Sequence, residues 1–348
     1  MKKNDLKYMS VSTLADLKTA NVYWQPNRYC NYECSYCWPT AHTKVKDFVD
    51  KDIAFKTIDR CVEKFKERDV TRINWGWSGG ESTFHPNFLD FQERILSHKS
   101  DELRMSFNLT TNLSHNLSWW KKFVEITKGY WHVAVSASLH QEFVDTPDKV
   151  DKFLEKLEYL RSQGCKVMVN QVMDPDIFDD QLKTLEKFYE EDFRVNTKIN
   201  STLHKNYMRH TGKTIYSDEQ LDKMNQSQKG TRRKYYESFV MAIDTNDDDV
   251  YFDTFEQVKN QGLWYLSDWI CSAGYLSVAI ENNVIKRGVG GCHKQILGHL
   301  DEEWELHDEP KLCGIKAEYP CTCVADLKMP KWNPEHATES EWKKIKTI

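Results

Sequence analysis

The sequence predicts an α/β protein, built from a partial (β/α)6 barrel and a small cysteine-rich domain that follows it. Two observations support this prediction. Between residues 22 and 200, short apolar runs alternate with amphipathic helical stretches, which is typical of parallel βαβ units. After residue 269 this alternation ends and a group of five cysteines follows. Six strand–helix units are too few for a closed eight-stranded barrel, so we expect an open one.

The expected elements alternate in the order that such a barrel requires. The strands are residues 22–25, 72–77, 105–112, 131–139, 166–173 and 194–200. The helices between them are residues 53–68, 87–96, 117–126, 150–163 and 178–189. In the first helix, Ile53, Ile58 and Val62 recur at helical spacing. The strand segments 133–135 and 167–169 are continuously apolar, as expected for parallel strands buried on both faces.

Changes in this pattern divide the chain into four expected parts. They are a partial barrel at 1–202, an irregular bridge at 203–268, a cysteine-rich domain at 269–325 and a tail at 326–348. Residues 1–20 are expected to form a short polar leader. The bridge holds two expected strands, 239–243 and 250–252, and the cysteine-rich domain holds a hairpin of 276–280 with 284–286. The acidic turn 244–249 lacks the Gly and Glu of a calcium-binding loop.

Composition narrows the class of function. The chain has 348 residues and a hydrophobic fraction of 40%, which suit a globular protein. Its net charge of −5 argues against nucleic-acid binding. Two basic clusters, 205–213 and 229–234, are expected to be solvated surface. The N-terminus has no signal-peptide run, and no apolar stretch is long enough to span a bilayer, so we expect a cytoplasmic protein without a membrane partner. Ten cysteines in that setting indicate reduced thiols that serve metals or redox chemistry.

Three of these cysteines, Cys30, Cys34 and Cys37, follow the first strand in a CxxxCxxC pattern. Iron–sulfur clusters are held by cysteine thiolates, normally one for each iron of a four-iron cluster. Three thiolates would leave one iron without a protein ligand and open to another molecule. The alternative is a zinc knuckle, because closely spaced cysteines also bind zinc.

The pattern resembles that of the radical S-adenosylmethionine (SAM) enzymes, whose core is a partial (β/α)6 barrel. The resemblance implies that Cys30, Cys34 and Cys37 hold a 4Fe-4S cluster that binds SAM and splits it into a 5′-deoxyadenosyl radical. It places Tyr36 near the adenine of SAM. It extends to Gly79-Gly80-Glu81 at the end of the second strand, because a Gly-Gly-Glu motif there binds the methionyl amine of SAM in this family. Ser82 stands where the family usually has Pro.

Further SAM contacts are predicted by position at the strand ends. The candidates are Asn112, Ser136, Ser138, Asn170 and Lys198. Ser136 and Ser138 resemble residues that bind the carboxylate or ribose of SAM, and Lys198 can pair with that carboxylate or with an acidic substrate. Each of them can instead be an ordinary hydrogen-bonded structural residue.

Three bulky side chains are candidates for the cavity wall. They are His140, Trp75 and Trp77. Tryptophan at such positions more often packs in the core.

The second group of cysteines comprises Cys271, Cys292, Cys313, Cys321 and Cys323. It resembles the SPASM/twitch-type extension of radical SAM enzymes, which implies one auxiliary 4Fe-4S cluster. We favour Cys271, Cys292, Cys321 and Cys323 as its ligands, with Cys313 as the substitute. A zinc ribbon with four thiolates is the alternative. Cys61 and Cys165 are expected to be ordinary buried thiols.

The sequence therefore predicts a radical SAM enzyme that abstracts hydrogen from a polar small molecule such as a sugar, nucleotide or aminocyclitol. Dehydrogenation, epimerisation and rearrangement are the expected reaction types, and flavodoxin or ferredoxin is the expected electron donor. Three alternatives remain open: maturation of a ribosomally made peptide, modification of a nucleic-acid base, and a non-enzymatic zinc-binding role. Only a short leader precedes the first expected strand, so we expect no fused peptide-binding domain and favour the small molecule.

Overall fold

In this computed structural model, two β-sheets organise the part of the chain that is described. The described residues are 6–11, 18–37, 43–200, 215–232, 240–244, 250–253, 263–289, 292, 295–313, 315, 321 and 329–338. Within them, one sheet has nine strands in the order β13-β12-β11-β2-β3-β4-β5-β6-β7, and the other has six in the order β14-β10-β15-β1-β8-β9.

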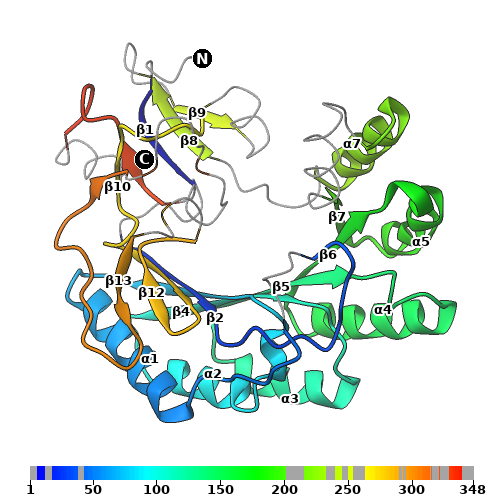
Figure 1. Cartoon of the computed structure of the whole chain (residues 1–348), viewed down its shortest axis with the longest axis horizontal. Helices are drawn as coiled ribbons and strands as arrows, with labels where there is room; N and C mark the ends of the chain where they lie inside the picture. The colour runs from blue at the N-terminus through cyan, green and yellow to red at the C-terminus, as the bar shows by residue number, and fades with distance from the viewer. Residues whose placement is uncertain are drawn as a thin grey trace.

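Six parallel strands in chain order form the open barrel. They are β2 (Thr19–Gln25), β3 (Arg72–Trp77), β4 (Arg104–Thr111), β5 (His132–Leu139), β6 (Lys166–Met173) and β7 (Arg194–Ile199). The connecting helices are α1 (Lys51–Lys66), α2 (Phe88–Leu96), α3 (Leu117–Thr127), α4 (Pro147–Ser162) and α5 (Phe178–Glu190). Figure 1 shows the sheet curving around an open concave side, with α1 to α4 along its convex side. The predicted α/β class and its parallel barrel sheet are confirmed.

Local capping fixes where these helices begin. The Asp50 carboxylate accepts hydrogen bonds from the first turn of α1, and the Asn116 side chain does the same for α3. Thr146 caps α4, and Pro147 occupies its first turn, where the missing N–H costs nothing. Therefore α4 starts three residues before the predicted position, which was based on its apolar residues alone.

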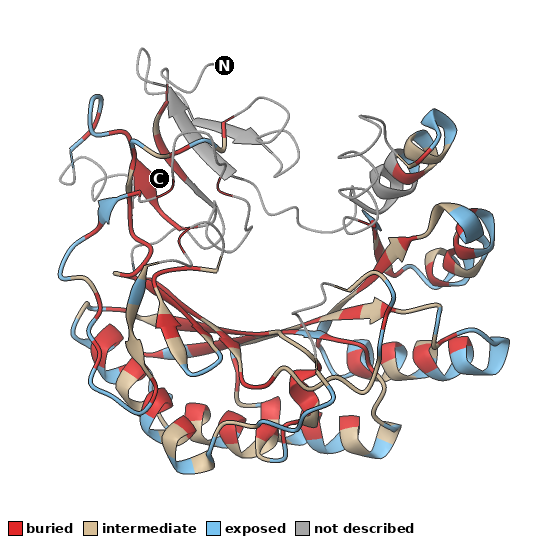
Figure 2. Cartoon of the chain, viewed as in Figure 1, coloured by how far each residue is buried: buried red, intermediate tan, exposed pale blue. Residues whose placement is uncertain are grey.

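The convex face of the barrel sheet holds the main core. Trp24 stacks on Trp77 with ring centroids 5.5 Å apart, and Trp77 meets Phe88 and Phe91 of α2 at 5.3 and 6.3 Å. Trp75 stacks beside Trp77 at 6.4 Å. Of the three candidates for the cavity wall, Trp75 and Trp77 instead pack in the core, as tryptophan at such positions more often does, because both side chains point toward the helices. Figure 2 shows that the buried residues lie mainly on the sheet and on the inner faces of the helices.

Segments from the C-terminal half extend the barrel sheet. β11 (Ser277–Glu281) pairs in parallel with β2, and β12 (Val284–Lys286) and β13 (Ile296–His299) follow as antiparallel strands. The predicted hairpin of 276–280 with 284–286 is confirmed by β11 and β12, and the sheet crosses the predicted domain boundary.

The second sheet gathers strands from both ends of the chain. It contains β1 (Leu6–Val11), β8 (Val240–Asp244), β9 (Val250–Asp253), β10 (Ile270–Cys271), β14 (Lys311–Leu312) and β15 (Lys331–Trp332). β1 pairs with β15 and β8, and Leu6 and Met9 are fully buried. The expectation of a polar leader at 1–20 is wrong for Leu6 and Met9, because both side chains are buried in an apolar cluster.

The predicted irregular bridge also contains regular structure. α7 (Asp218–Arg232) lies in it, and β8 and β9 form the expected antiparallel pair. The basic cluster 205–213 lies outside the described residues, as does the end of the cluster 229–234. No helix in the described ranges combines the length and apolar character needed to cross a membrane.

Candidate active site

The three cysteines of the CxxxCxxC pattern lie on the loop after β2, which we call the cysteine loop (residues 26–37). All three are in the reduced thiol form, and Cys34 is buried. The Cys37 amide donates to the Cys34 carbonyl at 3.0 Å, and the Cys30 amide donates to the Thr43 carbonyl at 3.2 Å. The Lys44 ammonium donates to the Cys30 carbonyl at 3.1 Å. These bonds hold the loop at the carboxyl end of the barrel strands, where parallel sheets carry their chemistry.

The environment of Cys30 and Cys34 favours the protonated thiol. Burial raises the pKa of Cys34 to about 12 and also raises the pKa of Cys30. A bound metal cation removes the proton from such a thiol outright. Among the described residues, no three His, Cys, Asp or Glu side chains converge tightly enough to hold a single metal ion. A four-iron cluster needs a wider arrangement, because each cysteine binds a different iron.

The Gly79-Gly80-Glu81 motif lies directly against the cysteine loop. The Glu81 amide donates to the Tyr29 carbonyl at 2.7 Å, and the Gly80 amide donates to the Asn27 carbonyl at 3.4 Å. A Cβ atom on Gly80 would lie 2.3 Å from the Tyr29 carbonyl oxygen, and Gly79 has a φ of +115°. Both positions therefore require glycine. The end of β3 and the cysteine loop form one hydrogen-bonded unit.

Within this unit the Glu81 carboxylate is oriented by its neighbours. It is 1% exposed, and one oxygen accepts hydrogen bonds from the hydroxyls of Thr83 at 2.6 Å and Thr111 at 2.9 Å. The other oxygen accepts from the Asn112 amide at 2.6 Å. Burial raises the pKa of Glu81, and the hydrogen bonds oppose that shift. The arrangement fixes the carboxylate in a position where it can accept from an ammonium group.

Asn112 connects the end of β4 to the cysteine loop. Its side-chain amide donates to the Asn31 side chain at 2.8 Å, and the Asn31 amide donates to the Ser114 hydroxyl at 3.0 Å. The same Asn112 nitrogen lies 4.0 Å from the Cys30 sulfur. Asn112, a predicted SAM contact, thus lies beside Cys30, while sequence reasoning assigned no role to Asn31.

His140 joins the site from the end of β5. Its Nδ1 lies 3.2 Å from the Cys34 sulfur and 2.6 Å from the Tyr36 hydroxyl. Burial lowers the pKa of His140 to about 4, so the imidazole is neutral near pH 7. Glu142, two residues later, accepts from the Ser35 amide at 3.0 Å and also binds the Ser35 hydroxyl. Sequence reasoning missed Glu142 because no motif marks a residue that only holds a loop.

Alternate residues of the barrel strands form a polar concave wall. The Asn74 amide donates to Asn21 at 3.0 Å, and Asn108 donates to Asn74. On the other side of the barrel, Asn170 donates to the Ser136 hydroxyl at 2.5 Å, and Asn196 donates to Asn170 at 3.0 Å. Two predicted SAM contacts, Ser136 and Asn170, are therefore bonded to each other. Ser138, two residues further along β5, is half-buried on the same face.

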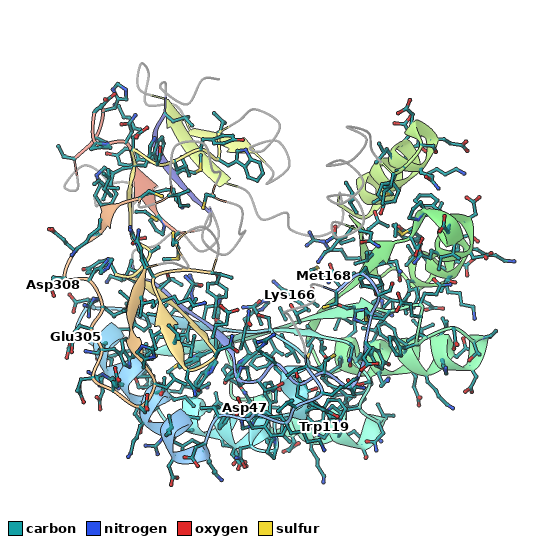
Figure 3. All side chains as sticks on the ribbon, viewed as in Figure 1. Asp47, Trp119, Lys166, Met168, Glu305 and Asp308 are labelled. Atoms are coloured by element: carbon teal, nitrogen blue, oxygen red, sulfur yellow. The ribbon has the colours of Figure 1, made fainter. Side chains whose placement is uncertain are left out.

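The described charged side chains of this concave wall are cationic, and none is a carboxylate. Figure 3 shows Lys166 and Met168 on the concave side of β6, and alternation then places Lys198 of β7 on the same side. At the described concave positions of β2 to β7 there is no Asp or Glu. The Lys198 side chain is exposed, yet surrounding protein displaces part of the water from its ammonium and lowers its pKa.

Four of the five C-terminal cysteines are described, and Cys323 lies outside the described residues. Cys292, Cys313 and Cys321 are buried in one apolar cluster with Trp269. A hydrogen bond with Cys292 lowers the pKa of Cys313 to about 6, helped by nearby Lys331 and Arg287. Cys313, ranked from sequence as a substitute ligand, is thus directly beside Cys292. Cys271 lies on β10, which pairs with β14 just before Cys313.

Arg287, like Lys331, is a buried cation next to these cysteines. It is 1% exposed, and it donates to the carbonyls of Cys271 at 3.3 Å and Lys311 at 2.7 Å. It also donates to Ala273, Leu312 and the Gln295 side chain, so its hydrogen bonds within the described chain all go to neutral oxygens. A buried charge is costly unless an opposite charge compensates it. The thiolates of the neighbouring cysteines can supply negative charge here, as can Glu309, which lines the same pocket as Arg287.

Comparison with known proteins agrees with this geometry. The model of the radical SAM superfamily matches residues 24–215. A GTP 3′,8-cyclase from Staphylococcus carnosus (strain TM300) is 25% identical over 169 residues, which are 47% of this chain and 48% of the cyclase. This chain therefore spans about half the length of the curated relative that it matches.

Solved structures share the fold. The structure described as native anSMEcpe with bound AdoMet has 16% identity, covers 82% of this chain and 78% of its own, and gives a TM-score of 0.53. Native anSMEcpe with bound AdoMet and Kp18Cys peptide gives a TM-score of 0.55 at 16% identity, covering 82% and 79%. The family match itself covers more than half of the chain. This chain belongs to the radical SAM superfamily, a family of enzymes that use a 4Fe-4S cluster and SAM.

Proposed function

We propose that Cys30, Cys34 and Cys37 hold the catalytic cluster, and that Gly79, Gly80 and Glu81 bind the methionyl end of SAM. One observation carries this assignment: the Glu81 amide donates to the Tyr29 carbonyl at 2.7 Å, one residue before Cys30. The two motifs are far apart in sequence but adjacent in space. When bound, the cluster supplies the single electron that splits SAM and yields the 5′-deoxyadenosyl radical.

The protein's own part is to bind and orient. Glu81, held by Thr83, Thr111 and Asn112, accepts the methionyl ammonium of SAM. Tyr36 lies beside Cys34 and supplies a ring for the adenine. The remaining predicted SAM contacts are Asn112, Ser136, Ser138, Asn170 and Lys198. Ser136 and Asn170 are already bonded to each other, so Ser138 offers the more available hydroxyl on β5.

Replacing Cys34 tests this assignment. Cys34→Ala should abolish formation of 5′-deoxyadenosine and lower the iron content, because one thiolate of the cluster is lost. Cys165→Ala is the matched control, because Cys165 is also a buried thiol but lies at the start of β6. It should keep both properties. Undiminished 5′-deoxyadenosine from Cys34→Ala would refute the assignment.

For the substrate, we propose a polar small molecule that carries an anionic group, with a nucleotide as the favoured case. The concave wall supports this, because it presents amides, hydroxyls and Lys198 and has no described carboxylate. The similarity to a GTP 3′,8-cyclase is in keeping with a nucleotide. The anSMEcpe structure with a bound peptide shares the fold only, so it does not favour peptide maturation. No described feature favours modification of a nucleic-acid base.

Substrate-stimulated SAM cleavage tests the substrate class. We expect GTP to stimulate 5′-deoxyadenosine formation more than guanosine does, because only the nucleotide carries the negative charge. Lys198→Met should raise the KM for the stimulating nucleotide about tenfold, which corresponds to about 1.4 kcal/mol. Lys198→Arg should keep most of the affinity. Equal stimulation by guanosine and GTP would contradict an anionic substrate.

We also propose one auxiliary 4Fe-4S cluster held by four of the five C-terminal cysteines, with Cys292 and Cys313 among them. The support is their mutual hydrogen bond, the lowered pKa of Cys313 and the buried Arg287 that has no described carboxylate partner. Like other enzymes of its family, this one needs a reductant, and we propose flavodoxin or ferredoxin for that role.

A further inference from the structure

The imidazole of His140 contacts the cysteine loop but has no part in the SAM chemistry proposed above. His140 directly follows β5, and its Nδ1 lies 3.2 Å from the Cys34 sulfur. The same nitrogen lies 2.6 Å from the Tyr36 hydroxyl. Tyr36 is also within hydrogen-bonding reach of the Cys34 sulfur. Cys34 is therefore next to two side chains that can donate hydrogen bonds.

Aromatic packing holds the imidazole in this orientation. The Tyr36 ring stacks on His140 with centroids 5.9 Å apart, and the edge of Tyr32 meets it at 5.7 Å. Tyr32 is itself stacked on Phe143 at 4.1 Å. Rings packed on two sides leave the imidazole little freedom to rotate away from the sulfur. The contact with Cys34 is thus a directed one.

We propose that His140 donates its Nδ1–H to the Cys34 thiolate and thereby raises the reduction potential of the catalytic cluster. The proposal rests on the assignment of Cys34 as a cluster ligand. A thiolate that binds iron can only accept, so this bond requires the tautomer in which Nδ1 carries the hydrogen. In that tautomer the Tyr36 hydroxyl, 2.6 Å away, accepts from the same N–H and keeps its own hydrogen for the sulfur. Reduction adds negative charge to the cluster, and hydrogen bonds to its sulfurs stabilise that charge. The Tyr36 hydroxyl can donate to the same sulfur.

Redox titration of the reconstituted protein, followed by electron paramagnetic resonance (EPR), tests this role. His140→Phe keeps a ring in place but removes the donor. It should shift the one-electron reduction equilibrium about tenfold toward the oxidised cluster, a fall of about 59 mV. His140→Gln restores an N–H donor and should recover most of the shift. Equal potentials for wild type and His140→Phe would overturn the proposal.

His132 provides a matched control on the same strand. It is the first residue of β5 and faces the same side, eight residues or about 26 Å from His140. His132→Phe should leave the potential unchanged. Pulsed EPR of protein with 15N-labelled histidine gives a second test that does not depend on measuring a potential. It should detect a 15N coupling to the reduced cluster that His140→Gln lacks, and its absence from the wild type would overturn the proposal.

Failure of this inference is separable from failure of the proposed function. If wild-type protein assembles no EPR-active cluster, the assignment of Cys30, Cys34 and Cys37 fails. If the cluster assembles and cleaves SAM but the potential and the 15N coupling do not depend on His140, only this inference fails.

Discussion

At the scale of single residues, Glu81 shows how the barrel prepares a charged group for a ligand. Its carboxylate is almost fully buried, and burial alone would favour the neutral acid. Donors from Thr83, Thr111 and Asn112 favour the charged form instead. Two of these donors belong to the end of β4, so the site depends on the register between β3 and β4.

Removing one donor tests this dependence. Thr111→Val keeps the shape of the side chain but deletes the hydroxyl that binds Glu81. We expect a loss of about 1–2 kcal/mol in the free energy of unfolding, together with a higher KM for SAM, because the carboxylate loses a partner. Urea denaturation and SAM-cleavage kinetics measure the two effects. Thr111→Ser should behave nearly as wild type, and an unchanged KM in Thr111→Val would contradict the role of this hydrogen bond.

Site residues could be predicted from the sequence where a motif has a characteristic spacing and directly follows a predicted strand. The cysteine pattern and Gly79-Gly80-Glu81 could be found because each follows a strand that the periodicity identifies. The hydrogen bonds between side chains of the concave wall could not be predicted from the sequence. Ser136 and Asn170 face the concave side as expected, but which atom each bonds depends on the alignment of β5 and β6. His140 and Glu142 have contacts that only the folded loop creates.

At the scale of elements, the connection from β3 to α2 is fixed by a neutral histidine. His85 is 2% exposed, its Nδ1 accepts from the Asn87 amide at 3.1 Å, and its Nε2 donates to the Val49 carbonyl at 3.1 Å. Both nitrogens are used only when the ring is neutral. Burial accordingly lowers the pKa of His85 to about 4. The contact with Val49 joins this connection to the start of α1.

This arrangement predicts a dependence of stability on pH. Below its unfolded-state pKa of about 6.5, His85 takes up a proton more readily in the unfolded chain than in the folded one. Stability is therefore fully present above pH 6.5 and is lost as pH falls toward 4. Between pH 7.5 and 5.0, His85 should account for a loss of about 2 kcal/mol. Urea denaturation should show a smaller loss over this range for His85→Gln, and an equal loss would contradict the assignment.

Most elements could be predicted because their signals are local. The bounds of β3 and β6 match the prediction to the residue, since polar turns delimit both strands clearly. The helix starts were less accurate, because α4 begins at a capping residue and a proline that precede its apolar positions. β1 was missed, because six residues whose partners are β8 and β15 carry too short a pattern to read alone.

At the scale of the whole molecule, the two cysteine groups are linked through one sheet. β11 pairs in parallel with β2, the strand that leads into the cysteine loop. The polypeptide between β10 and β13 thereby connects Cys271 and Cys292 to the edge of the barrel. A single sequence does not reveal this connection, because the paired residues, such as Val22 and Val278, are far apart along the chain.

Iron analysis tests whether the second group also holds a cluster. Cys292→Ala should remove about half of the iron from the reconstituted protein, because each cluster holds its own set of irons. The catalytic cluster should remain, so 5′-deoxyadenosine should still form. Cys61→Ala is the control, because Cys61 is a buried thiol of α1 and belongs to a different apolar cluster from Cys292. Unchanged iron with bound zinc would replace the auxiliary cluster by a zinc site.

The most direct test of the central claim is anaerobic reconstitution of the wild-type protein with iron and sulfide, followed by reduction in the presence of SAM. We expect iron–sulfur absorbance and the conversion of SAM to 5′-deoxyadenosine and methionine. Protein that acquires no such absorbance, or that acquires it and leaves SAM intact under reduction, is not a radical SAM enzyme of the kind proposed.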